Sequence, residues 1–222
     1  MGTSYYTENM DIDNASVEEV ATFIQSELQN GIHQNKTHYP GLNGEIECSY
    51  PLTLSDRRHL QATACQDPKI PISIHPGRSI EAPFEAVRIL LESGANERKV
   101  SMCHLDRTLL TNKHLAKFAD EFKCFLQFEL FEIENSFYQT APVFMPNDGQ
   151  RLKFIKFLVE SENCTERSND IWRKNRLLAY GGQGYGHLLR TVTPMAREVV
   201  KLSETEWNTI TWDNPKKWLT WE

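Results

Sequence analysis

The first clear hydrophobic pattern of the chain begins after Ser16, where apolar residues such as Val20 and Ile24 recur every three or four positions. Ser16 and Glu19 have the spacing of a capping box, in which each side chain accepts a hydrogen bond from the other residue's backbone N–H. Gly31 follows the pattern and is typical of the position just beyond a helix end. Together these signals predict a helix of about four turns between Ser16 and Gly31.

Further along the chain, short apolar runs alternate with helical patterns. The runs that predict strands cover residues 44–49, 70–75, 99–104 and 124–130. The helical patterns cover residues 53–67, a segment with Pro83 in its first turn that ends at Gly94, a segment capped by Thr111 and a segment capped by Asp148. Connections of this length are typical of parallel strands joined by crossover helices.

Two architectures join parallel strands in this way: the doubly wound sheet and the (β/α)8 barrel. No predicted strand is followed by the G-x-G-x-x-G turn of dinucleotide-binding sheets. Titratable residues instead follow the carboxyl ends of the strands, where barrel enzymes build their active sites. The chain has 222 residues, of which 40% are hydrophobic, so it can form one sizeable core. We therefore expect an α/β fold of barrel type with a single domain over residues 1–222.

The composition excludes several classes of partner. The net charge is −6 and no block of Lys or Arg occurs, so neither a nucleic acid nor an anionic membrane is expected to bind. No apolar run approaches the roughly 20 residues of a membrane span, and MGTSYYTENMDID has no secretory pattern, so we expect a cytoplasmic location. The five cysteines include no C-x-x-C pair, which predicts reduced thiols in the core.

Three residues with metal-binding side chains occur in consecutive predicted strands: Glu45, His75 and His104. One histidine at a strand end is more often a hydrogen-bonded boundary residue than a ligand, but two equivalent ones favour a shared pocket. Imidazoles and carboxylates suit Zn²⁺ or a similar divalent ion. An open position on such an ion would activate a water molecule, and a nearby carboxylate could accept its proton.

Several phrases of the sequence carry a resemblance to a known family. They are GEIECSYPLT, IHPGRSIEAPFE, SMCHLDRTL, YGGQGYGHLL and the closing NPKKWLTW. In these phrases, which run over nearly the whole chain in one register, the sequence resembles the phosphotriesterase-related branch of the phosphotriesterase family, within the amidohydrolase superfamily.

The resemblance implies a (β/α)8 barrel that holds two divalent metal ions, here Zn²⁺, and hydrolyses a small molecule. It implies that Glu45 bridges the ions, that His75 and His104 are ligands, and that Asp170 is both a ligand and the general base. Animal members of this branch are linked to N-acetyltaurine, so the implied reaction is hydrolysis of the amide of N-acetyltaurine or a similar N-acyl amino acid by a metal-activated water. Lactones and phosphotriesters are the alternative substrates, and a homo-oligomer stays open.

The sequence departs from the family pattern in two respects. The family carries an H-x-H pair on its first barrel strand, and this chain contains no H-x-H, because the resemblance begins after the third strand. We therefore expect a partial barrel that lacks about the first three strands. The segment before Asp170 also has almost no apolar residue to bury between barrel strands. A catalytically inactive fragment of the family, which retains the fold in part and binds at most one metal ion weakly, is the competing hypothesis.

Other polar residues near these phrases are weaker candidates. Asp106 and Arg107 could orient His104 as a pair, or form a plain surface ion pair. The glycine-rich stretch 181–187 could close over a substrate through Tyr185 or His187, or be a structural turn. Arg78 could bind an anionic head group, on the basis of its charge alone.

Overall fold

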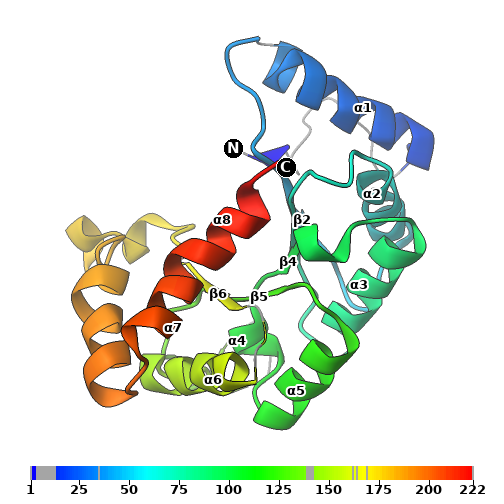
Figure 1. The fold of residues 1–222 in the computed structure, drawn as a ribbon. Coiled ribbons are helices and arrows are strands. Elements are labelled where there is room, and N and C mark those ends of the chain that lie inside the picture. Colours follow the sequence, from blue (N-terminus) through cyan, green and yellow to red (C-terminus); the bar gives the residue numbers. More distant parts are fainter. Residues whose placement is uncertain are drawn as a thin grey trace. The chain divides into compact units, whose positions relative to one another are not determined.

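The computed structural model describes residues 2–3, 14–34, 36–138, 143–161, 163, 165–168 and 170–221, in which strands and helices alternate along the chain (Figure 1). The strands are β1 (Gly2–Thr3), β2 (Leu42–Glu47), β3 (Ile72–His75), β4 (Val100–Met102), β5 (Phe125–Phe128) and β6 (Thr165–Arg167). The α-helices are α1 (Val17–Asn30), α2 (Leu54–Ala64), α3 (Ala82–Glu92), α4 (Leu105–Thr108), α5 (Asn112–Glu121), α6 (Asp148–Glu160), α7 (Glu204–Asn208) and α8 (Asn214–Leu219). Single turns of 3₁₀-helix (Ile32–Gln34, Glu97–Lys99, Lys174–Arg176 and Leu178–Tyr180) and of π-helix (Leu188–Val192, Met195–Val199 and Thr209–Asp213) complete the helical segments.

The strands pair in parallel, as the long connections predict. β1 pairs with β2, β2 with β3, β3 with β4, and β5 with β6. In the register between β3 and β4, Ile74 lies opposite Met102, and the backbone N–H of Cys103 donates to the carbonyl of Ile74 at 2.9 Å. The carboxyl ends of β3 and β4 therefore lie at the same level of the sheet. This arrangement confirms the prediction of parallel strands with crossover helices.

Helices α1, α2 and α6 each begin directly after a capping residue, and for α6 this residue differs from the predicted one. Ser16 and Thr53 cap α1 and α2 through complete capping boxes, as the sequence pattern predicts for α1. The cap of α6 is Asn147 rather than Asp148, because Asn147 has the extended backbone of a capping residue and its side chain accepts from the N–H of Gln150 at 2.9 Å. Asp148 is instead the first residue of the helix.

The hydrophobic pattern does not predict two of the strands, β1 and β6. β1 has only two residues, which is too short for any periodicity. β6 is polar, yet its backbone pairs with β5 and the side chain of Thr165 is fully buried. The guanidinium of Arg167 lies 4.5 Å from the ring centroid of Trp207, so an aromatic ring covers a charged residue of this strand. Residues 165–167 thus form a strand although the segment before Asp170 has almost no apolar residue, as the sequence indicates.

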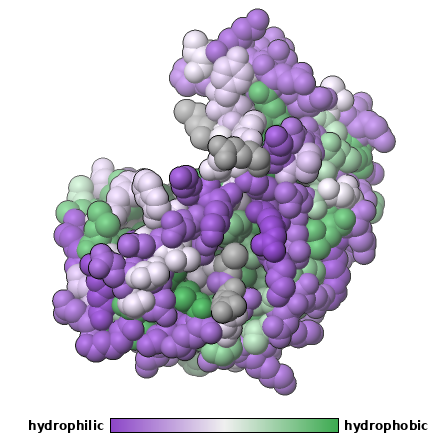
Figure 2. All heavy atoms as spheres, in the orientation of Figure 1, coloured by the Kyte–Doolittle hydropathy of each residue, from purple (hydrophilic) through white to green (hydrophobic). Residues whose placement is uncertain are grey.

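The chain forms two compact units. The first comprises residues 1–103, 122–125 and 216–222, and the second comprises residues 104–121 and 126–215. The expectation of a single domain over residues 1–222 stays a prediction. In the first unit, α1 packs on α2 through a small cluster that includes Val20, Ile24 and Ala62. The visible face of α1 is largely hydrophilic, as its amphipathic pattern requires (Figure 2).

The first unit also includes the C-terminal end of the chain. The buried ammonium of Lys99 donates hydrogen bonds to the carbonyls of Lys217 at 2.9 Å and Trp218 at 3.3 Å, and also to that of Thr220. In return, the indole N–H of Trp218 donates to the carbonyl of Lys99 at 3.0 Å. These bonds satisfy carbonyls at the end of α8 that have no partner within the helix. They hold residues 217–220 to the segment that leads into β4.

The described cysteines are free thiols, as predicted, but not all of them lie in the core. Cys48, Cys103 and Cys124 are free and buried, whereas Cys65 is free and exposed at the end of α2. Cys164 lies outside the described residues. Among the helices of the described ranges, none combines the length and the apolar character that crossing a membrane requires.

Candidate metal centre

A β-bulge in β2 positions Glu45. Asn43 lies opposite Ile72 and Ile46 lies opposite Ile74, so β2 has one residue more than β3 over this stretch. The extra residue breaks the strict alternation of side chains between the two faces of the sheet, and bulges next to sites commonly redirect a side chain in this way. Glu45 lies within this bulge.

The bulge requires glycine at position 44. Gly44 has a φ of 132°, which residues with an L side chain rarely adopt. A Cβ atom at this position would lie 2.4 Å from the carbonyl oxygen of Ser73 on the neighbouring strand. The absence of a side chain therefore allows β2 to approach β3 closely just before Glu45.

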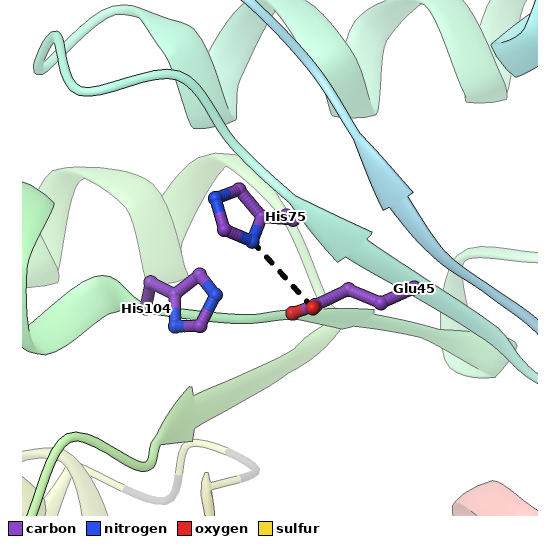
Figure 3. Close-up of side chains that lie close together, drawn as sticks. All are labelled: Glu45, His75 and His104. Atoms are coloured by element: carbon purple, nitrogen blue, oxygen red, sulfur yellow. Dashed lines mark ion pairs between the residues drawn. The ribbon is translucent and has the colours of Figure 1, made fainter. Parts of the chain in front are cut away.

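His75 ends β3 beside this bulge. Its Nδ1 lies 3.5 Å from Oε2 of Glu45, with His75 partly buried and 42% of the Glu45 side chain exposed (Figure 3). The carbonyl of His75 accepts the backbone N–H of Cys48 at 2.8 Å, which fixes the strand end against β2. The pair therefore consists of one carboxylate and one imidazole held by neighbouring parallel strands.

His104 occupies the equivalent place after β4. It is 2% exposed, and its backbone is left-handed with a φ of 55°, a conformation that histidine adopts more readily than most residues. Its carbonyl accepts the hydroxyl of Thr108 at 3.0 Å, within the single turn of α4. The prediction of a strand over residues 99–104 is thus wrong at its end, where the chain turns into α4 instead.

The three residues singled out by the sequence lie together. Glu45, His75 and His104 each offer one ligand atom, and these atoms all lie within 4.8 Å of one another (Figure 3). In Figure 3 the Glu45 carboxylate points toward the two imidazoles. A second group that meets the same limit consists of Glu45, Cys103 and Glu129. No other such group of three occurs within the described part of the chain.

Asp170 is not a member of either group, and its role as a ligand and general base stays a prediction. It is partly buried and follows β6. Its backbone N–H donates to the carbonyl of Glu129 at 3.0 Å. Asn169, which precedes it, lies outside the described residues.

Asp106, one of the two residues expected to orient His104, has strong partners outside the site. Asp106 is fully buried and its Oδ2 accepts from Nε of Arg151 at 2.9 Å and from the backbone N–H of Leu130 at 2.9 Å. Burial raises the pKa of the Asp106 carboxyl, and the Arg151 guanidinium opposes this rise. Arg107 is also buried, so a surface ion pair between Asp106 and Arg107 is wrong. Asp106 instead anchors α4 to α6.

The glycine-rich stretch 181–187 ends in a structural contact. His187 is 5% exposed, and its Nε2 lies 2.6 Å from Oδ2 of Asp148. The other oxygen of Asp148 accepts from Nη1 of Arg151 at 3.0 Å. Of the two residues proposed to contact a substrate, His187 is thus engaged in the interior of the second unit, whereas Tyr185 is exposed. Arg78 is also exposed.

One residue of the site region was not selected from the sequence. Glu129 directly follows β5, and its side chain is 5% exposed. Its Oε1 accepts the backbone N–H of His104 at 2.8 Å and lies 2.7 Å from His104 Nδ1. The rule that selected His75 and His104, a polar residue at the carboxyl end of a parallel strand, would also have selected Glu129.

The donor set fits one divalent cation. One carboxylate and two imidazoles are the ligand types of catalytic zinc sites, which keep a further position for water or substrate. A deeply buried histidine beside a half-exposed carboxylate also gives such a site one open side. For a second ion, the described residues offer the overlapping group with Cys103 and Glu129 and no H-x-H pair. The two-ion expectation therefore has direct support for one ion only.

Comparisons with known proteins point in the same direction as the sequence phrases. Residues 2–219 match the model of the phosphotriesterase family. N-acetyltaurine hydrolase of Homo sapiens is 40% identical over 230 residues, which cover all of this chain and 65% of that protein. N-acetyltaurine hydrolase of Bos taurus is 38% identical over 229 residues with the same coverage. The chain thus spans 65% of the length of these curated relatives.

Solved structures establish the fold. A resiniferatoxin-binding protein from Rhodobacter sphaeroides superposes with a TM-score of 0.83 at 21% identity, over 98% of this chain and 61% of that one. A phosphotriesterase homology protein from Escherichia coli superposes with a TM-score of 0.81 at 24% identity, over 97% and 71% of the respective chains. The prediction of a partial (β/α)8 barrel is thereby confirmed.

Proposed function

Because this chain belongs to the phosphotriesterase family, we propose that it acts as a metal-dependent hydrolase on the amide bond of N-acetyltaurine or a similar N-acyl amino acid. The observation that carries the proposal is the grouping of Glu45, His75 and His104, whose ligand atoms lie within 4.8 Å of one another. Relatives at about 40% identity that carry the name N-acetyltaurine hydrolase support the choice of substrate.

The proposed ligands would hold the ion from three consecutive segments of the sheet. Glu45 would supply a carboxylate oxygen, and His75 and His104 would each supply a neutral imidazole nitrogen. When bound, a divalent ion such as Zn²⁺ supplies a Lewis acid and makes a coordinated water molecule more acidic. The chain's own contribution is to place one ligand in the bulge of β2, one at the end of β3 and one just after β4, and to leave one side open.

Amide hydrolysis also needs a group that moves protons. We assign this role to the Asp170 carboxylate, which would accept the proton of the attacking water and transfer it to the leaving nitrogen. In the balanced reaction, the oxygen of water bonds to the carbonyl carbon, the C–N bond breaks, and acetate and the free amine are formed. The hydrogen bond from Asp170 to Glu129, a residue in contact with His104, supports a place for Asp170 near the site.

A second candidate is a family member that binds metal without catalysis. The observation in its favour is the absence of any H-x-H pair from the sequence. With only three grouped ligands, an ion would be bound more weakly than in a complete two-ion site.

Metal content and turnover, measured on the same preparations, separate these candidates. The purified chain is loaded with Zn²⁺ or Mn²⁺, the bound metal is quantified, and hydrolysis of N-acetyltaurine, a lactone and a phosphotriester is followed. Glu45→Gln removes the charged ligand. Glu47→Gln, two residues along β2 and exposed, makes the same chemical change outside the group.

We expect one bound ion per chain, hydrolysis of N-acetyltaurine, and loss of both in Glu45→Gln but not in Glu47→Gln. Asp170→Asn is expected to keep the metal and lose turnover. Bound metal without turnover of any substrate would support the second candidate. Turnover of only the lactone or the phosphotriester would overturn the assignment of an amide substrate.

A further inference from the structure

Glu129 is a buried carboxylate with three separate attachments. It lies at the carboxyl end of β5, and 4% of the residue is exposed. One oxygen, Oε1, accepts the backbone N–H of His104 at 2.8 Å. The other, Oε2, accepts hydrogen bonds from Nε2 of Gln127 and from the hydroxyl of Ser168 at 3.3 Å. The carboxylate therefore has little freedom to rotate away from His104.

The same oxygen also faces the imidazole ring of His104. Nδ1 of His104 lies 2.7 Å from Oε1 of Glu129, and both side chains are at most 5% exposed. The two atoms are close but are not aligned as a hydrogen bond, so the interaction between them is electrostatic. At this separation an unprotonated Nδ1 would hold its partial negative charge close to a carboxylate oxygen, which is unfavourable in a buried place. A proton on Nδ1 removes this repulsion. The neutral ring then carries its free lone pair on Nε2.

Glu129 also stabilises the backbone conformation of His104. The left-handed conformation of His104 is one that most residues avoid, and the bond from its N–H to Oε1 stabilises it. The backbone carbonyl of Glu129 in turn accepts the N–H of Asp170 at 3.0 Å. One residue thus contacts two of the four proposed site residues.

We propose that Glu129 is the positioning residue of the metal centre, which holds His104 in the tautomer that presents Nε2 to the ion. This inference rests on the proposed function for the presence of the ion, but the contact itself exists without metal. Metal-bound histidines commonly donate their second N–H to a carboxylate, and loss of that partner typically lowers metal affinity or activity by 10–100-fold. Glu129 acts through His104 and is not itself a ligand in this arrangement.

The group of Glu45, Cys103 and Glu129 gives the inference a definite rival. If this group bound the ion, Glu129 would be a ligand and the Cys103 thiolate would be another. A thiolate bound to Co²⁺ gives an intense charge-transfer absorption, whereas carboxylate and imidazole ligands do not. The spectrum of the Co²⁺-loaded protein therefore distinguishes the two roles.

The test compares Glu129→Gln with Glu132→Gln. The amide side chain introduced in the first variant keeps an oxygen for the His104 N–H but loses the charge. Glu132 is similarly buried, three residues further on, and its carboxylate binds Arg176 and the backbone N–H of Gln183. The first measurement is the ¹⁵N chemical shift of both ring nitrogens of His104 in metal-free protein at pH 8, with signals identified through His104→Gln. The second is the Zn²⁺ dissociation constant, by competition with a chromogenic chelator.

In the wild type and in Glu132→Gln we expect a protonated Nδ1 and an unprotonated Nε2. In Glu129→Gln we expect a mixture of tautomers and a Zn²⁺ dissociation constant that is about 10–100-fold higher. Unchanged ring shifts in a folded Glu129→Gln, or a thiolate band with Co²⁺, would overturn the inference. A change of His104 tautomer in Glu129→Gln, combined with a wild type that binds no Zn²⁺, would support the contact and would contradict the proposed function.

Discussion

Nδ1 of His75 and Oε2 of Glu45 lie 3.5 Å apart although the two residues belong to different strands. In the register of β2 and β3 the residue opposite His75 is Glu47, not Glu45. The bulge between Asn43 and Ile46 makes the approach of Glu45 possible, because it adds one residue and turns the side chain.

Gly44→Ala is expected to destabilise the first unit and to weaken metal binding. The added Cβ would meet the Ser73 carbonyl at 2.4 Å and would also strain a positive φ, so we expect a loss of about 2–4 kcal/mol in the free energy of unfolding. Gly94→Ala is the control, because Gly94 also has a positive φ but nothing within 4 Å of its would-be Cβ. Strain alone should cost about 1 kcal/mol there. Equal losses in urea unfolding would contradict a steric role for Gly44.

Arg151→Met is expected to destabilise the second unit by about 3–5 kcal/mol, because it leaves the carboxylates of Asp106 and Asp148 buried without their guanidinium. Lys153→Met is the control on the exposed side of the same helix. Thermal and urea unfolding would measure both losses.

The loss in Arg151→Met should also depend on pH. Burial already raises the pKa of Asp106 in the folded state, and without Arg151 it would rise further. A group with a raised folded pKa binds its proton more tightly when folded, so its contribution to stability is lost as pH rises through that value. The variant should therefore be less destabilised at pH 5 than at pH 8. A loss independent of pH would count against a charged Asp106 as its cause.

His59 is expected to lower the free energy of unfolding under mildly acidic conditions. Burial lowers its pKa from the ordinary value of 6.5, although the Asp56 carboxylate opposes this shift. Below pH 6.5 the unfolded chain takes up a proton that the folded protein binds less readily, so stability falls as pH drops below this value. The free energy of unfolding between pH 8 and pH 5.5 should fall more steeply in the wild type than in His59→Gln. Parallel curves would exclude His59 as a source of the acid sensitivity.

Thiol labelling should distinguish the cysteines by burial. Cys65 is exposed and is expected to react with iodoacetamide in the native protein, whereas Cys48, Cys103 and Cys124 should react only after unfolding. Burial raises the pKa of the Cys48 thiol, and the carboxylates of Asp56 and Glu47 raise it further, so little reactive thiolate forms there. Peptide mapping by mass spectrometry assigns each label, with Cys65→Ser as the control. Rapid native labelling of Cys48 would show that this part of the core opens readily.

Hydrophobic periodicity was sufficient for the elements with a clear apolar face or a fully buried run. It located α1 and α3, and it placed both ends of β3 and of β5 to within two residues, because their buried side chains leave a pattern in the sequence. It missed β6, whose pairing with β5 depends on backbone hydrogen bonds and whose Arg167 is covered by Trp207. That cover comes from a residue 40 positions away and leaves no local signal.

The site was predictable to the extent that it follows from strand ends. His75 and His104 are predictable in this way, and so is Glu129, which directly follows β5. The expectation that Glu45 also lies at a strand end is wrong, because Glu45 lies inside β2 and approaches the histidines through the bulge, which leaves no signal in the sequence pattern. The partners of Asp106 could not, because Arg151 lies 45 residues away and both residues look like ordinary surface charges in the sequence. The cap of α6 was predicted one residue too late, at Asp148, because the side chains of Asn147 and Asp148 both suit a cap and only the backbone conformation distinguishes them.

The ammonium of Lys99 and the carbonyls that it binds are separated by 118 or more residues of chain. During synthesis, β4 and the residues before it leave the ribosome long before those carbonyls are made. Until then the ammonium of Lys99 can be hydrated only by water. The first unit can thus reach its final form only when the last turn of α8 has been made. Folding of the N-terminal half therefore finishes only after the C-terminal residues have left the ribosome, because the partners of Lys99 are among the last residues to be synthesised.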